Sequence, residues 1–221
     1  MSEAPSVPYE PAWVHPSALV EAGVNLGQGT RVWDSVHIRR NARIGRSCIV
    51  GEKTYIAYDV EIGDFCKLNA SVYVCAQVII EDFVMIAAHT VFTNDRYPRS
   101  GNIELTGLET SDVTDETLAT RVCRGVTIGA NATIGPGITL GEFSMVGMGS
   151  VVTHTVAPFR LVVGNPARPV AWVCMCGEPL AKGDDAEMAP GAPPRVIDCH
   201  RCKREYELDA VSGLRVLEAE G

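Results

Sequence analysis

Residues 32–55 read VWDSVH, IRRNAR, IGRSCI and VGEKTY, four consecutive blocks of six residues that each begin with an apolar side chain. The same period runs without a slip from Val20 to Tyr97, and it resumes over residues 122–157. The fifth residue of every block is small or β-branched, except for Arg96 at the end of the first run. A period of six fits neither an amphipathic helix nor a simple alternating strand.

The repeat predicts an all-β fold, a left-handed parallel β-helix with hexapeptide periodicity. Each block can supply one short strand and one corner, and three blocks close a triangular coil of about 18 residues. First and fifth positions then point inward, and the two runs together make a little over six coils, about 30 Å long at the usual strand spacing. We expect the glycine, asparagine and aspartate residues at second and third positions to adopt positive φ at the corners. These residues include Gly27, Gly45, Gly51, Gly63, Asp64 and Asp82.

A polar stretch of 24 residues, Pro98–Arg121, separates the two runs. Loops longer than about 12–15 residues inside a compact domain are usually functional or disordered. Because loops carry binding residues more often than cores do, we expect this insertion to contribute to a site. The alternative is a tolerated insertion without function.

The composition excludes some classes of partner. A formal net charge of −8 argues against indiscriminate binding to nucleic acid or to anionic membranes. No apolar run approaches the roughly 18 residues of a membrane span, and residues 1–10 lack the apolar stretch of a signal peptide. We therefore expect a cytoplasmic protein with reduced thiols. An anionic substrate would need a local basic cluster, for which the candidates are Arg39, Arg40, Arg43, Arg46, Arg96, Arg99, Arg121 and Arg124.

Four of the eight cysteines cluster near the C-terminus as Cys174, Cys176, Cys199 and Cys202. Two such pairs resemble a zinc ribbon, and four thiolates suit a closed, structural Zn²⁺ site. His200 could replace one thiolate, and unliganded thiols or a disulfide are the alternatives. Since a tail of this size holds little core by itself, it needs such a staple. We predict a β-helix domain over residues 1–172 and a zinc-ribbon-like domain over residues 173–221.

Several short motifs add a family resemblance to the repeat. They are Ser35–Ile38, Val91–Asp95, Arg96–Ser100, Thr127–Asn131 and Val163–Arg168. With the repeats, they make residues 12–172 similar to left-handed β-helix acyltransferases, and in particular to N-acetyltransferases that modify the 3-amino group of nucleotide-linked amino sugars. One branch of that family acts on UDP-2-acetamido-3-amino-2,3-dideoxyglucuronate in O-antigen synthesis, and another on dTDP-linked 3-amino-3,6-dideoxyhexoses. The motifs are shared by both branches, so both substrates stay open.

The resemblance implies a homotrimer with active sites between neighbouring subunits. It also implies that acetyl-CoA, the co-substrate, lies in a groove beside the C-terminal coils. The residues that the resemblance assigns to this groove are Ala130, Gly147, Met148, Pro166, Ala167 and Arg168. Met148 is bulkier than the alanine that is common at its position in the family, and His154 stands where a lysine is common.

N-acylation needs alignment of amine and thioester, a proton acceptor, and a donor to the oxyanion. Asn94 matches the family asparagine that contacts the reacting centre, although it could serve only a corner turn. His89 is the candidate base because the pKa of histidine lies near neutrality, unless it only bonds to backbone. Asp95, Arg96 and Arg99 are candidates for sugar or phosphate binding, or for plain surface ion pairs. His37, almost three coils before His89, could face a site across a subunit boundary or satisfy a core hydrogen bond.

Two other classes of function fit the same prism. A metal-dependent hydratase of the γ-carbonic-anhydrase type needs three histidines around zinc. The five histidines, His15, His37, His89, His154 and His200, are poorly spaced for that purpose. A non-enzymatic scaffold is the third class. Acetyl-CoA turnover with a 3-amino nucleotide sugar separates the three, because hydratase and scaffold should show none.

Overall fold

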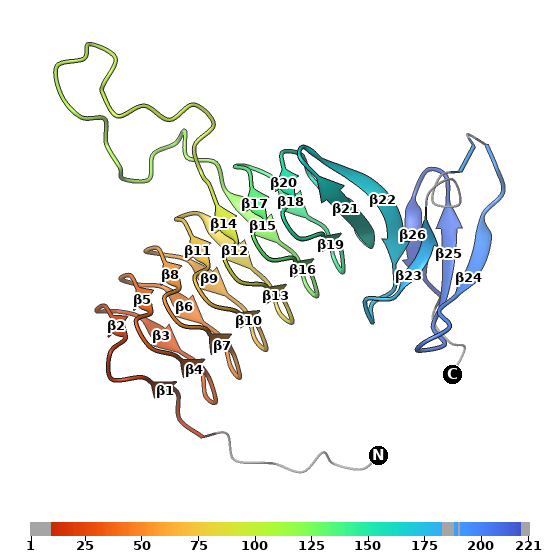
Figure 1. Cartoon of the computed structure of the whole chain (residues 1–221), viewed down its shortest axis with the longest axis horizontal. Coiled ribbons are helices and arrows are strands. Elements are labelled where there is room, and N and C mark those ends of the chain that lie inside the picture. The colour runs from red at the N-terminus through yellow and green to blue at the C-terminus, as the bar shows by residue number, and fades with distance from the viewer. Residues whose placement is uncertain (1–9, 183–187, 190, 218–221) are drawn as a thin grey trace.

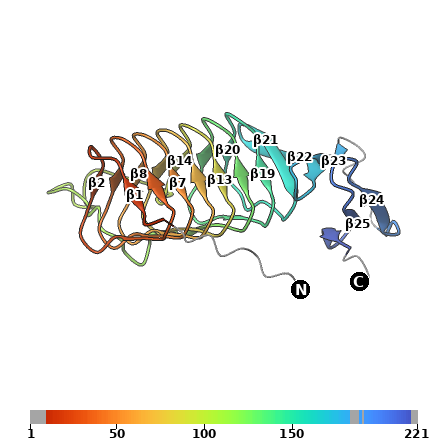
Figure 2. The same cartoon turned by 90° about the horizontal axis from the view of Figure 1, so that it is seen from below.

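The computed structural model describes residues 10–182, 188–189 and 191–217. Its six-residue blocks wind into a three-sided β-helix, with coils stacked in register along one axis (Figures 1 and 2). Each face is a parallel sheet with one short strand from each coil, so the fold predicted from the period is confirmed. Over the described parts of the chain, no helix is long and apolar enough to cross a membrane.

The strands follow the faces in strict rotation. Face 1 contains β1 (Trp13–Val14), β4 (Arg31–Val32), β7 (Ile49–Val50), β10 (Lys67–Leu68), β13 (Met85–Ile86), β16 (Thr127–Ile128), β19 (Met145–Val146) and β21 (Arg160–Gly164). Face 2 contains β2 (Leu19–Val20), β5 (His37–Ile38), β8 (Tyr55–Ile56), β11 (Tyr73–Val74), β14 (Val91–Phe92), β17 (Thr133–Ile134) and β20 (Val151–Val152). Face 3 contains β3 (Asn25–Leu26), β6 (Arg43–Ile44), β9 (Glu61–Ile62), β12 (Val78–Ile80), β15 (Thr120–Val122) and β18 (Thr139–Leu140).

The core runs along the axis of the prism. First-position side chains from Val32 to Val152 are all buried, as the repeat predicts. Each fully buried Val, Leu or Ile contributes about 1.5–3 kcal/mol of transfer free energy. Buried threonines at fifth positions tie neighbouring coils together. The Thr30 hydroxyl, for example, donates to the Gly45 carbonyl at 2.6 Å and accepts from the Cys48 amide at 3.0 Å.

The corners differ from the sequence prediction. Positive φ occurs at the fourth position of the blocks, as at Ser35 (φ 56°) and Asn41 (φ 61°), rather than at the second or third. Glycine is needed at second positions for another reason, the close approach of stacked backbones. A Cβ on Gly27 would lie 2.4 Å from the backbone carbon of Gly45, and one on Gly45 would lie 2.6 Å from that of Gly63.

Replacing Gly27 with alanine is therefore expected to destabilise the protein by about 2 kcal/mol or more, because the new methyl group meets backbone that cannot rotate away. Gly107→Ala is the matched control, since nothing lies within 4 Å of its added Cβ. Melting temperatures of the two variants check the prediction. Equal values would show that the coils can separate freely at this corner.

The insertion leaves the prism between faces 2 and 3. It runs from Thr93 to Ala119, between β14 and β15, so it starts earlier than the predicted 98–121 and ends before Thr120, which is already strand. Figure 1 shows it extending outward from the body. The Tyr58 hydroxyl accepts from the Val113 amide at 3.1 Å, which ties the returning arm of the insertion to the prism.

Both ends of the β-helix reach further than the repeat count predicted. Face 1 has eight parallel strands, from β1 to β21, which span about 34 Å at the usual spacing. The last coil is two residues short, because Val156 pairs with Leu140 and Val162 with Val146 across 16 residues. Val156 therefore lies above a first-position residue, and its predicted assignment as a fifth position is wrong.

The C-terminal segment caps the last coil. β22 (Ala167–Val173) and β23 (Pro179–Lys182) extend face 1 with antiparallel pairing, and β24 (Arg195–Asp198), β25 (Glu205–Asp209) and β26 (Gly213–Val216) form a separate three-stranded sheet. A second small core joins the two parts. Its buried members are Phe159, Trp172, Cys174, Ala181, Cys199, Tyr206, Leu208 and Leu214. Because Phe159 and Trp172 belong to it, this core crosses the predicted boundary at residue 172.

Candidate functional site

The corners between faces 1 and 2, called here the 1–2 edge, form a track of small residues along the C-terminal coils. Ala87–His89, Gly129–Asn131 and Gly147–Gly149 occupy it in three successive coils, and the turn Gly164–Pro166 follows. The stacking is tight, since a Cβ on Gly129 would lie 2.5 Å from the Met148 nitrogen. Short side chains leave the backbone of this edge within reach of an elongated ligand.

The residues predicted for acetyl-CoA all lie on or next to the last three corners of this edge. Ala130, Gly147 and Ala167 are half-buried, whereas Met148, Pro166 and Arg168 are exposed. The Met148 side chain is 83% exposed, so it projects beside the track rather than filling it. Arg168 donates to the carbonyl of its neighbour Ala167 at 2.9 Å, which leaves its other donors for a ligand anion.

His89 lies on the same edge, one coil before Gly129. It occupies the fourth-position corner with φ 61°, its amide donates to the Ala70 carbonyl at 3.0 Å, and its side chain is exposed. The positive φ is an unusual conformation for a residue other than glycine. The imidazole is therefore held on a rigid corner and faces solvent, where a proton could be exchanged.

Asn94 lies on a different edge, between faces 2 and 3, where the insertion begins. Its backbone carbonyl accepts from the Leu118 amide at 3.1 Å, so the two arms of the insertion are joined at this point. The Asn94 side-chain amide donates to the Ala76 carbonyl at 3.4 Å, a long bond that leaves the group half-buried. Because β14 separates the two corners, one chain does not bring Asn94 and His89 together.

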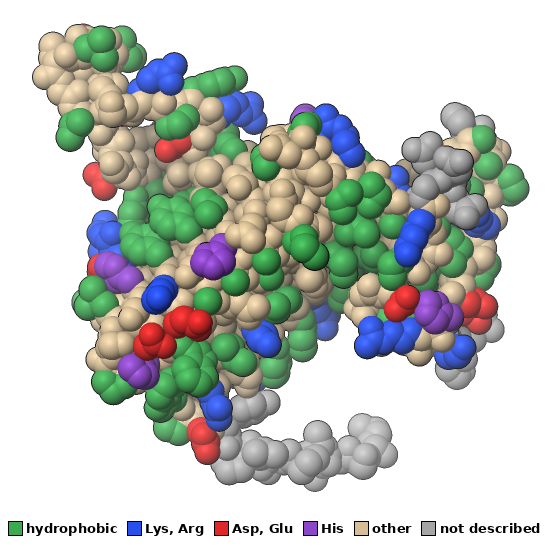
Figure 3. Space-filling model, viewed as in Figure 1, with side chains coloured by type: hydrophobic (Ala, Val, Ile, Leu, Met, Phe, Trp, Pro, Cys, Tyr) green, Lys and Arg blue, Asp and Glu red, His purple; other side chains and the backbone are tan. Residues whose placement is uncertain are grey.

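The predicted substrate-binding residues of the insertion, Asp95, Arg96 and Arg99, are all exposed. Basic and apolar side chains lie side by side on this projecting segment in Figure 3. Beneath it, Cys75 is buried, and desolvation raises the pKa of its thiol to about 12. This thiol is therefore protonated at neutral pH and is a packing residue rather than a nucleophile.

His37 belongs to a polar network on face 2 that the sequence did not predict. Its Nε2 lies 2.9 Å from Glu21 Oε1, and Arg39 Nε lies 2.7 Å from the same oxygen. Arg39 also donates to the Tyr55 hydroxyl at 2.8 Å, and the Tyr55 ring stacks on Tyr73 at 5.2 Å. The hydrogen bond from His37 is the largest cause of a lowered Glu21 pKa. The network lies on the outer surface, so His37 does not serve the core.

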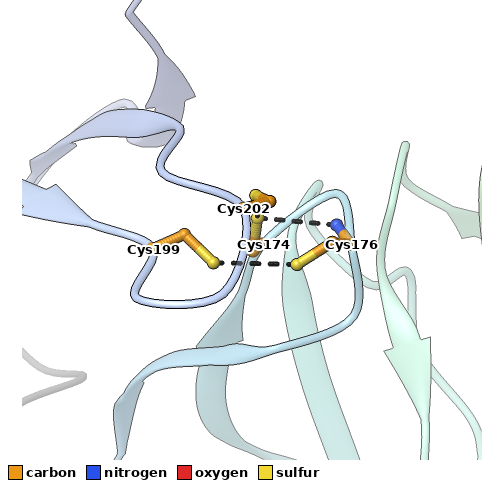
Figure 4. Close-up of side chains that lie close together, drawn as sticks. All are labelled: Cys174, Cys176, Cys199 and Cys202. Atoms are coloured by element: carbon orange, nitrogen blue, oxygen red, sulfur yellow. Dashed lines mark hydrogen bonds between the residues drawn. The ribbon is translucent and has the colours of Figure 1, made fainter.

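The four tail cysteines form the second candidate site. Cys174 and Cys176 lie in the turn between β22 and β23, and Cys199 and Cys202 lie between β24 and β25 (Figure 4). All four sulfur atoms lie within 4.8 Å of one another. The Cys174–Cys202 and Cys176–Cys199 sulfur pairs are 3.3 Å and 3.6 Å apart. Sulfur atoms bound to one tetrahedral zinc at about 2.3 Å have similar separations, so the donor set fits the metal.

Neighbouring groups separate this cluster from other functions. His200 lies 3.4 Å from a Glu178 carboxylate oxygen, so the cluster consists of cysteines alone. The Arg204 backbone amide is the largest cause that lowers the pKa of Cys202, to about 6, whereas burial raises that of Cys174 to about 12. In residues 10–182, 188–189 and 191–217, no histidine joins a group of metal-binding side chains.

Comparison with known proteins agrees with the repeat. Residues 119–154 match the family model described as bacterial transferase hexapeptide (six repeats). A stretch of 61 residues is 48% identical to dTDP-3-amino-3,6-dideoxy-alpha-D-galactopyranose 3-N-acetyltransferase of Aneurinibacillus thermoaerophilus. That match covers 28% of this chain and 32% of the relative, so the chain spans about a third of the length of that curated relative.

Solved structures with a similar fold include two sugar-modifying proteins. PerB from Caulobacter crescentus, solved with CoA and GDP-perosamine, is 23% identical over 73% of this chain and 57% of its own, with a TM-score of 0.41. The N-acyltransferase AntD from Bacillus cereus, solved as a mutant with dTDP and coenzyme A, is 20% identical over 72% and 80%, with a TM-score of 0.46. Fold and matched repeat define a hexapeptide-repeat protein of the left-handed β-helix class.

Proposed function

We propose that this protein is an acetyl-CoA-dependent N-acetyltransferase acting on the 3-amino group of a nucleotide-linked amino sugar, in surface polysaccharide synthesis. The observation that carries the proposal is the 1–2 edge, where an open track of small residues leads to an exposed corner histidine, His89. The curated relative, which is named for the same reaction on a dTDP-linked sugar, supports it. Both substrates of such a reaction are cytoplasmic metabolites, and we place the protein in that compartment.

Acetyl-CoA is assigned to the C-terminal part of the 1–2 edge. Ala130 and Gly147 would let the pantetheine arm approach the backbone, while Arg168 offers a cation to a phosphate group. The exposed Met148 side chain would cover the arm from one side. The thioester then lies toward His89, in the direction of the N-terminal coils.

The chemistry needs few side chains, because the thioester is already activated. The sugar amine attacks the carbonyl carbon of the thioester, and the C–S bond then breaks and releases the CoA thiolate. His89 accepts the proton that the amine nitrogen loses. The Asn94 side-chain amide donates to the oxygen that becomes negative in the transition state. Asp95, Arg96 and Arg99 would hold the sugar and its diphosphate.

A homotrimer resolves the separation of Asn94 and His89. The two lie on different edges of one chain, at the two ends of the corner–strand–corner segment around β14. In a cyclic trimer, the 1–2 edge of one subunit can face the insertion of the next. The proposed site therefore combines His89 of one copy with Asn94, Arg96 and Arg99 of its neighbour. His37 could face the same boundary from face 2.

The sugar is UDP-linked 3-amino glucuronate or a dTDP-linked 3-amino-3,6-dideoxyhexose. A thiol-release assay of acetyl-CoA against a panel of amino nucleotide sugars tests the proposal. We expect CoA release that depends on a 3-amino nucleotide sugar, and the preferred sugar identifies the branch. No release with any sugar amine would contradict the proposal and favour a hydratase or a scaffold.

For the tail, we propose one structural zinc held by Cys174, Cys176, Cys199 and Cys202. Four thiolates leave no open coordination position, so this metal would stabilise the fold and take no part in acyl transfer.

A further inference from the structure

A shallow hollow of about 310 Å³ lies on the N-terminal half of the 1–2 edge, beyond the track assigned to acetyl-CoA. Its size is at the lower end of the range for small-molecule sites. The lining that matters consists of Trp33, Gly51, Glu52, Asn69, Ala70 and Ala88. These residues come from four successive coils, and His89 directly follows the last of them.

The hollow exists because small residues follow one large one. Trp33 occupies a second position on this edge, and Gly51 occupies the same position one coil later. A Cβ on Gly51 would lie 2.6 Å from the backbone carbon of Asn69, so stacking itself keeps this position empty. The Trp33 ring is 43% exposed, and its edge-to-face contact with Trp13 at 5.5 Å orients it. The result is a fixed indole next to open space.

The polar lining has a definite hydrogen-bonding pattern. The Glu52 carboxylate only accepts hydrogen bonds when ionised, whereas the Asn69 amide can donate as well as accept. A ring N–H flanked by a carbonyl matches these two groups. Uracil and thymine carry that arrangement, while cytosine and adenine present an unprotonated ring nitrogen at the corresponding place. An aromatic surface such as Trp33 favours stacking of any base, so the discrimination would come from Glu52.

The position along the edge suits the rest of a nucleotide sugar. Trp33 and Ala88 are three coils apart, about 14 Å at the usual strand spacing. That span is comparable with an extended diphosphate that joins a nucleoside to a hexose. Lys53 and Ser71 occupy the fourth-position corners between them, and Lys53 offers an exposed cation to the diphosphate. A base at Trp33 therefore places the sugar amine beside His89.

We propose that this hollow binds the uracil or thymine base of the acceptor substrate, with Trp33 as the stacking surface and Glu52 as the acceptor for the ring N–H. The inference rests on the proposed function, because it assigns the nucleotide end of the same acceptor. It adds a nucleobase subsite and two specificity residues that lie far from the acyl-CoA track.

Calorimetric titration of the full-length protein with UDP, dTDP, CDP and ADP tests this subsite without acyl transfer. We expect UDP and dTDP to bind about tenfold or more tightly than CDP and ADP, and Trp33→Ala to weaken UDP binding by about tenfold. Glu52→Gln should reduce the preference for UDP over CDP, since a carboxamide can also donate to the cytosine ring nitrogen. Phe65→Ala, which removes an exposed aromatic ring from another edge, is the matched control and should bind UDP as the wild type does.

Equal affinities of the wild type for UDP and CDP would overturn the inference. Unchanged UDP affinity in a Trp33→Ala variant with a normal melting temperature would do the same. If Trp33→Ala does not fold, the UDP-to-CDP ratio of Glu52→Gln decides by itself. Acetyl transfer to a nucleotide amino sugar with an unchanged KM in Trp33→Ala would overturn this subsite alone. Absence of both transfer and nucleotide binding would overturn the proposed function as well.

Discussion

Cys199→Ser is expected to release the tail metal and to unfold the C-terminal segment, while the β-helix stays folded. Apparent binding free energies of structural zinc reach about 10–16 kcal/mol in small domains, where metal binding and folding are one event. The second core is small, and two of its buried members are the cysteines themselves, Cys174 and Cys199. Without the metal, little else holds this core together.

The effect should reach the last coil of the prism through one aromatic chain. The Tyr206 hydroxyl lies 3.0 Å from the Cys174 sulfur and accepts from the Met175 amide at 3.0 Å. The buried Tyr206 ring packs edge-on against Phe159 at 5.9 Å, and Phe159 stacks on Phe143 at 5.6 Å. Movement of the cysteine turn therefore disturbs the aromatic residues that close the prism.

Metal analysis and hydrogen exchange measure this outcome. We expect about one zinc per wild-type chain and none in Cys199→Ser. Amides of β24–β26 should then exchange rapidly, those around Phe159 should exchange moderately faster, and those of β4–β14 should not change. Cys123→Ser, at a half-buried corner away from the cluster, is the matched control and should keep its metal. Gently purified wild-type protein without any metal would contradict the proposal.

The sequence was sufficient for the architecture because the signal repeats. Each inward position recurs every six residues, so single exceptions such as Arg96 do not obscure the period. The cysteine pairs were equally informative, since their sulfur atoms meet as the spacing predicts. Both features depend on residue type at a fixed spacing, which a sequence displays directly.

The corners and the C-terminal end were harder to predict, because they depend on how coils stack. The fourth positions with positive φ include Phe65, Phe83 and His89, residue types that give no turn signal. The closing coil lost two residues, and the regular period continued to Val156 only by coincidence of apolar residues. Backbone contact between coils, as at Gly27, explains second-position glycines that looked like turn residues.

The site was predicted only where a motif marked it. Asn94 and His89 follow from the motif and from residue chemistry, but the strand that separates them is apparent only in the structure. The network of Glu21, His37 and Arg39 escaped notice, although its members and Tyr55 lie 16 to 18 residues apart, close to one coil. Searching polar residues at the coil period would have found both this network and the hollow beside Trp33.

Asn94→Ala is expected to lower kcat by about 10²–10³-fold, the usual loss when one donor to a developing oxyanion is removed. The folded state should tolerate the change, because the side-chain bond to the Ala76 carbonyl is long, at 3.4 Å, and a single net hydrogen bond contributes only about 1 kcal/mol. The backbone bond from Leu118 to the carbonyl of residue 94 does not depend on the side chain. Steady-state kinetics and melting temperature together separate catalysis from folding.

Asn25→Ala is the matched control, because Asn25 is an exposed asparagine on β3, on face 3. It should keep wild-type kinetics. Near-normal kcat/KM in Asn94→Ala would remove Asn94 from the site. A fall in melting temperature that accounts for the lost activity would make it a structural residue of the insertion.

Mixing two inactive variants tests whether the site is shared between subunits. If His89 and Asn94 act from neighbouring copies, His89→Ala and Asn94→Ala chains refolded together should form trimers in which some boundaries carry both intact residues. With equal amounts and random assembly, about a quarter of the boundaries are intact, so about a quarter of the wild-type activity should return. Two residues acting from one chain would give no recovery. Since β14 holds them on separate edges of the prism, we expect recovery.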